Sequence, residues 1–296
     1  APAEPIVTTF IGTAAVSLTR KLVYAIAPAN LVWGSAALSL IRKTMLAGPG
    51  QVGSSAIALR AKTLSATGII GGPSKIFNST STWVATSTIV QFEGIGAGGA
   101  GTAGTYTSDG SPGQGSGGGG GAYAKKRITG LTIGATYIVH VGTAAGDDTW
   151  FQSATTCLAK AGSNGQKGAV AAGGAGGQAS GCIGDVCYSG GNGGAAGQNS
   201  GGVGFFMGGG GGGPATDAGA GVDGSAPTGT QAAGNLVPGL GGTGGGGQGG
   251  TYIGFTPRLL PQTGSQPGGG GGGTGWDNNA AAPGGAGRVT LTPLTA

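Results

Sequence analysis

The chain has 296 residues, of which 75 are glycine, and only 8% of its residues are charged, with a net charge of +5. Globular proteins usually carry about 7% glycine and about 25% charged residues, so this composition argues against a conventional enzyme. Collagen is excluded because glycine does not recur at every third position, and a hydrophobic fraction of 38% with low net charge argues against a disordered chain.

The first segment contains a repeated motif. Similar sequences occupy residues 12–22, 34–44 and 53–63, and glycine or proline punctuates the copies. Apolar residues within a copy alternate, as at Val16 and Leu18, which is the period of a strand. We therefore predict tandem β-repeats over residues 1–80, each unit needing a neighbour to bury its apolar face.

Two features of this segment bear on location. The uncharged stretch 22–41 has the length of a membrane span, but proline and glycine interrupt it, and the repeat explains it better. No secretory signal is recognisable at residues 1–19, so we expect the protein not to be secreted through such a signal.

A second domain is predicted over residues 81–296. Glycine rises from 8 residues in the first 92 to 67 in the rest, and the short strand 89–93 leads into the glycine-rich part. Residues 123–128 and 137–141 read as a hairpin, and residues 288–292 as a closing strand. Neither part has a long basic run, so no nucleic-acid partner is expected.

The glycine-rich part cannot build an ordinary hydrophobic core. Ordering each backbone residue costs about 1–2 kcal/mol, and glycine offers no side-chain area to offset that cost. Extended left-handed helices with three residues per turn can instead approach closely and pair their peptide groups sideways. The predicted fold class is therefore all-β, with short N-terminal β-repeats followed by a β-framed domain of polyglycine II helices.

Few side chains could support catalysis, bind a metal or form a disulfide. We expect no catalytic residue, metal site or cofactor, because His140 is the only histidine and the adjacent Asp147 and Asp148 point apart in extended chain. Cys182 and Cys187 could close a local disulfide or remain free thiols, and the sequence leaves both open.

Aromatic residues near the glycine runs are candidates for recognition. In a bundle without side chains they must emerge at loops or at the edges, where they either bind a partner or cap the bundle ends. The receptor-contact candidates are Trp150, Phe205, Phe206, Tyr252, Phe255 and Trp276.

The order of these features resembles the glycine-rich domain of bacteriophage tail-fibre and adhesin proteins. The resemblance rests on residues 89–99, 117–142 and 283–291, and it covers residues 83–292. It implies a virion fibre subunit, made in the host cytoplasm without a signal peptide, that attaches to the host surface through loops between the glycine helices. Its partners would be other virion proteins through residues 1–80, a glycan or outer-membrane protein as receptor, and further copies in a homo-oligomer such as a trimer.

Other readings stay open. An ice-binding polyglycine bundle would need regular small residues on one flat face, whereas the glycine runs here are irregularly spaced. The protein could also be a structural decoration of the virion without a receptor.

Overall fold

The computed structural model describes residues 72–106, 112–168, 171–197, 205–228, 237–253, 256–274 and 281–295. The tandem repeats of residues 12–63 and the stretch 22–41 lie outside these described residues, as do Phe255 and Trp276. One compact unit spans Pro73–Leu294. It includes strand β1 (Lys75–Phe77), which precedes the predicted boundary at residue 80. The described residues form strands and one short 3-10 helix, η2 (Ala179–Gly181), without any α-helix, so the all-β prediction is confirmed.

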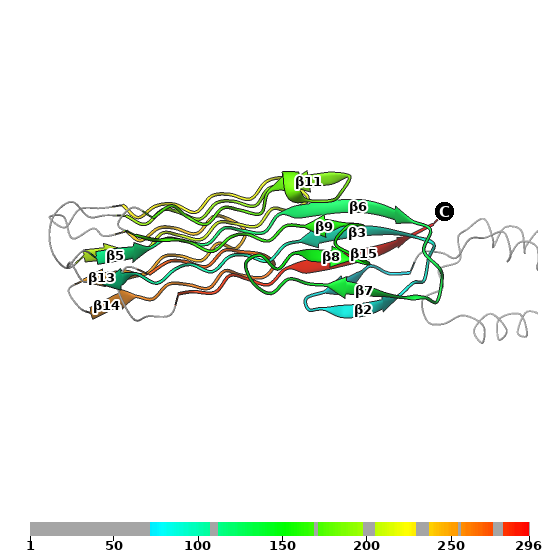
Figure 1. The fold of residues 1–296 in the computed structure, drawn as a ribbon, viewed down its shortest axis with the longest axis horizontal. Coiled ribbons are helices and arrows are strands. Elements are labelled where there is room, and N and C mark those ends of the chain that lie inside the picture. Colours follow the sequence, from blue (N-terminus) through cyan, green and yellow to red (C-terminus); the bar gives the residue numbers. More distant parts are fainter. Residues whose placement is uncertain are drawn as a thin grey trace, which may run out of the picture. The chain divides into compact units, whose positions relative to one another are not determined.

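Two antiparallel sheets frame one end of this unit (Figure 1). The larger has the order β1, β15 (Arg288–Leu294), β3 (Ile89–Ile95), β6 (Tyr123–Thr129) and β11 (Val186–Tyr188). The smaller has the order β2 (Ser81–Val84), β7 (Thr136–His140), β8 (Thr149–Phe151) and β9 (Leu158–Ala159). Alternate residues of both sheets point inward, and they form the hydrophobic core around Phe92, Leu291, Val139 and Phe151, all 0% exposed.

The predicted hairpin of residues 123–128 and 137–141 is wrong. Strand β6 pairs with β3 and β11, whereas β7 pairs with β2 and β8 in the other sheet. Gly130 and Gly134 adopt positive φ in the connection, and Leu131 between them is buried in the core. Ile128 and Val139 therefore reach the same core from opposite sheets, which one hairpin could not achieve. The predicted strands 89–93 and 288–292 are confirmed as β3 and β15, which pair with each other.

Extended glycine-rich segments continue from these strands and lie side by side (Figure 1). At their far end are two small sheets, which hold β10 (Lys167–Gly168), β5 (Pro112–Gly115) and β4 (Thr105–Tyr106), and β12 (Phe205–Met207), β13 (Thr251–Ile253) and β14 (Thr256–Leu259). Twelve segments of the described chain make up the bundle: residues 96–102, 115–122, 160–166, 171–178, 189–197, 208–215, 219–228, 237–243, 245–250, 260–265, 268–274 and 281–287.

Hydrogen bonds along segment 115–122 change partner with a period of three residues. The N–H groups of residues 115, 118 and 121 donate to segment 268–274, those of 116, 119 and 122 to segment 160–166, and those of 117 and 120 to segment 189–197. The carbonyls of the same residues accept, again in rotation, from segments 208–215, 96–102 and 171–178. Every peptide group of this segment is thus paired on both sides, as burial without side chains requires.

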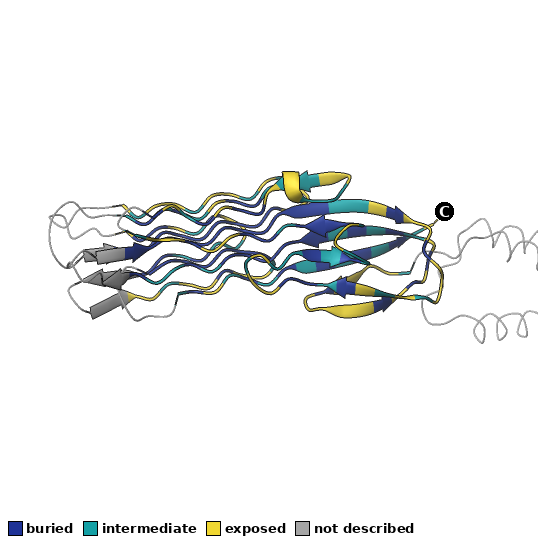
Figure 2. Ribbon diagram, in the orientation of Figure 1, coloured by how far each residue is buried: buried dark blue, intermediate teal, exposed yellow. Residues whose placement is uncertain are grey.

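Segments 208–215 and 268–274 follow the same rotation, so three mutually bonded segments form the interior and the remaining nine surround them. The interior segments contain the glycine runs 117–121, 208–213 and 268–273, which Figure 2 shows as buried. A Cβ added at Gly117 would lie 2.0 Å from the carbonyl oxygen of Gly210, and one at Gly119 would lie 2.1 Å from that of Ala175. Along these runs only glycine fits, because another peptide group occupies the place of the side chain.

Candidate functional site

The far end of the bundle gathers chain segments that are distant in sequence. In β12 and β13 the backbone register pairs Phe206 with Tyr252 and Phe205 with Ile253. The structure thus brings three of the predicted receptor-contact residues onto adjacent strands. Phe255 falls between β13 and β14 in the sequence, and Trp276 follows segment 268–274, but neither is among the described residues.

Polar side chains lie at the far ends of the interior segments 115–122 and 268–274. Ser116 is fully buried, and its hydroxyl donates to the carbonyl of Ala172 at 2.7 Å and accepts the Gln166 N–H at 2.7 Å. The Thr274 hydroxyl, also buried, accepts the N–H of Gly104 at 2.9 Å. These hydroxyls add side-chain donors and acceptors to the backbone pairs at the far ends of segments 115–122 and 268–274, and we call this layer the polar floor.

Gln114 belongs to the same floor, with 1% of its surface exposed. Its Oε1 is buried and has no hydrogen-bond partner in the described structure. The sequence holds a signal for this floor that was not recognised as one. Ser116 immediately precedes the glycine run 117–121, Gln114 lies two residues before Ser116, and Thr274 immediately follows the run 268–273.

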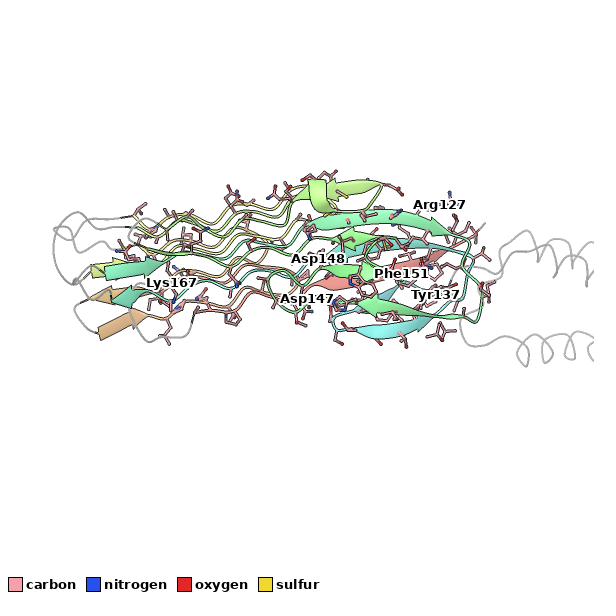
Figure 3. All side chains as sticks on the ribbon, viewed as in Figure 1. Arg127, Tyr137, Asp147, Asp148, Phe151 and Lys167 are labelled. Carbon is pink, nitrogen blue, oxygen red and sulfur yellow. The ribbon has the colours of Figure 1, made fainter. Side chains whose placement is uncertain are left out.

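Trp150 lies apart from the far-end residues. It belongs to β8 of the smaller framing sheet, where its ring stacks on His140 with centroids 4.9 Å apart and an angle of 18° between the planes. Figure 3 shows Asp147 and Asp148 of this region near the framing strands, while Lys167 marks the opposite end. The aromatic candidates therefore do not form one surface, and stacking on His140 gives Trp150 a structural role.

His140 and the two aspartates form separate contacts. The Asp147 carboxylate accepts from His140 Nε2 at 2.7 Å and from the Thr143 N–H at 2.9 Å. Burial raises the pKa of Asp147, but these hydrogen bonds outweigh it and leave the pKa below its ordinary value. Asp148 instead pairs with Lys160 Nζ at 2.6 Å. The two carboxylates thus contact different partners, His140 and Lys160.

All three cysteines are free thiols. Cys157 is buried in the framing core, and burial raises its pKa to about 12. Cys182 and Cys187 pack against the same core and share a side-chain hydrogen bond, and burial raises the pKa of Cys182 to about 11. Within the described ranges no cluster of three metal-ligating side chains occurs, and no helix there has the length and apolarity to cross a membrane.

The outer segments expose side chains at regular intervals. On segment 171–178 the exposed positions are Ala172, Ala175 and Gln178, and on segment 237–243 they are Val237, Leu240 and Thr243. A three-residue spacing is expected for segments whose partners rotate with a period of three. No protein-family model matches the chain, and no curated protein sequence matches it.

Proposed function

We propose that this protein is a non-enzymatic bacteriophage fibre or adhesin subunit that binds the host surface through the far end of its glycine-rich bundle. The observation that carries this proposal is the pairing of Phe206 with Tyr252 across adjacent strands at that end. Buried glycine segments with saturated peptide groups support those strands, and a rigid support keeps binding groups in place without loss of entropy.

The bundle itself is best explained as polyglycine II. This helix has three residues per turn and makes no internal hydrogen bonds, so its N–H groups point outward in three directions. The rotation of partners in segment 115–122 has that period. At about 3.1 Å per residue, the six glycines 208–213 would span about 19 Å, or two turns.

In this proposal the receptor is a glycan or an outer-membrane protein. Residues 1–80 would attach the subunit to other virion proteins, and a homo-oligomer, with a trimer as the first arrangement to test, would form the fibre. Aromatic residues suit both receptor classes because their rings stack on sugars and fill apolar pockets on proteins.

The test is host adsorption by virions that carry the double substitution Phe205→Ala and Phe206→Ala. We expect a reduced adsorption rate with normal particle assembly by electron microscopy. The matched control is Val222→Ala with Leu240→Ala, which removes two exposed apolar side chains from outer segments of the bundle. Adsorption of the Phe205/Phe206 variant at the wild-type rate would reject the contact assignment and favour a structural decoration.

Ice binding is a second candidate, because the outward positions recur every three residues. The exposed rows mix alanine, glutamine, valine, leucine and threonine, however, and lack the repeated threonine or alanine pattern that a flat ice-binding face requires. Thermal hysteresis of the purified protein separates the two: measurable hysteresis would support ice binding, and none is expected here.

A further inference from the structure

Segments on the surface of the bundle have one donor direction that leads away from it. In segment 189–197 the N–H groups of residues 190, 193 and 196 donate to segment 171–178, and those of 191 and 194 donate to segment 208–215. In this three-residue rotation the N–H of Asn192 belongs to the third direction, in which no backbone carbonyl of the described residues accepts it. Unpaired donors in a row are a template for pairing with another chain, as at the edge of a sheet.

At four places a side-chain oxygen of a neighbouring outer segment accepts an N–H that no backbone carbonyl accepts. The Asn192 N–H donates to Asp223 Oδ1 at 2.7 Å, and the Gly176 N–H donates to Asn192 Oδ1 at 3.0 Å. The pattern repeats at Ala100, whose N–H donates to Asn164 Oδ1 at 2.8 Å, and at Leu240, whose N–H donates to Ser225 Oγ at 2.8 Å.

These four acceptors share a position. Each belongs to an outer segment, each is exposed, and each accepts from the neighbouring outer segment rather than from its own. We call them the edge caps: Asn164, Asn192, Asp223 and Ser225. Their oxygens stand where a further glycine-rich chain would place its carbonyls.

We propose that the edge caps close the bundle against a second copy of this chain. The glycine-rich part has few charges to repel another copy, since residues 93–296 hold 7 basic and 8 acidic residues. Low net charge promotes association, so blocking must come from hydrogen bonding instead. The edge caps pair four N–H groups of outer segments inside one molecule and so leave a second copy fewer free donors.

The test is the quadruple variant Asn164→Ala, Asn192→Ala, Asp223→Ala and Ser225→Ala in the full chain. Its molar mass is measured by size-exclusion chromatography with light scattering at rising protein concentration. We expect at least a doubling of mass over the wild-type protein. The matched control removes four exposed polar side chains that accept no such N–H: Ser163→Ala, Asp217→Ala, Thr243→Ala and Gln262→Ala. It should keep the wild-type mass.

A rescue variant separates the acceptor oxygens from general polarity. Asn164→Asp, Asn192→Asp, Asp223→Asn and Ser225→Thr keep an oxygen at every edge cap, so this variant should also keep the wild-type mass. Wild-type mass for the alanine variant, or association of the rescue variant, would overturn the proposal. If the quadruple alanine variant does not fold, the molar mass of the single variant Ser225→Ala tests the proposal, because this substitution frees only the Leu240 N–H. A higher mass than wild type supports the proposal, and the wild-type mass rejects it.

Discussion

A single methyl group in the bundle interior tests whether peptide pairing holds this fold together. In Gly119→Ala the new Cβ would lie 2.1 Å from the carbonyl oxygen of Ala175, whereas ordinary contact begins at 3.4 Å. Segments 115–122 and 171–178 must therefore separate by roughly 1.3 Å to relieve the clash.

That separation has a calculable cost. The two segments are joined by hydrogen bonds of 2.8 Å from Gly174 to Gly117 and from Gly177 to Gly120, and both would stretch beyond hydrogen-bonding range. Losing them costs about 1 kcal/mol each, and overpacking costs a further 1–3 kcal/mol or so. Alanine recovers about 0.4–1 kcal/mol by restricting the unfolded chain. The net destabilisation is about 3 kcal/mol, which lowers the Tm of a domain of this size by about 6–12 °C.

The assay is thermal unfolding followed by circular dichroism or calorimetry. The matched control is Gly181→Ala, whose Cβ would meet only the flexible Lys160 side chain, with Cγ at 3.1 Å and Cδ at 3.3 Å. This control should unfold within about 2 °C of wild type, since a small movement of the lysine chain relieves the contact. If Gly119→Ala also folds and melts within about 2 °C of wild type, close peptide packing is not what stabilises the interior.

Two further predictions concern the framing sheets. Asp147→Asn should lower the Tm at pH 7 and have a smaller effect at pH 3. The pKa of Asp147 is lower in the folded protein, so its stabilisation of the fold is complete above its unfolded pKa of about 3.9. That stabilisation is lost as the pH falls through the folded pKa. Equal effects at both pH values in thermal melts would contradict this assignment. Cys157 should resist alkylation by iodoacetamide in the folded protein and react in denaturant, because burial removes access and raises its pKa. Peptide mass spectrometry reads the result, and rapid labelling of native Cys157 would show that the framing core opens.

The sequence by itself indicated the kind of core and its borders. An excess of glycine with few apolar side chains leaves peptide groups as the main resource for cohesion, and the structure pairs them throughout segment 115–122. Residues 89–93 and 288–292 were predicted as strands that border the glycine-rich part, and they form β3 and β15. The divergence of Asp147 and Asp148 followed from extended geometry alone.

Only the tertiary structure decided which segments became neighbours. Glycine carries no side chain to specify a partner, so segments 115–122, 208–215 and 268–274 could pair with any other glycine-rich segment as far as their sequences show. Their interior position follows from the length of their runs, since any side chain there would strike a neighbouring carbonyl. The assignment of β6 and β7 to different sheets, and of Trp150 to the framing end, likewise depended on long-range pairing and on a core filled from two sheets. Local alternation reports only which side of a strand is apolar, and the partner strand is chosen by contacts that form when the whole chain folds.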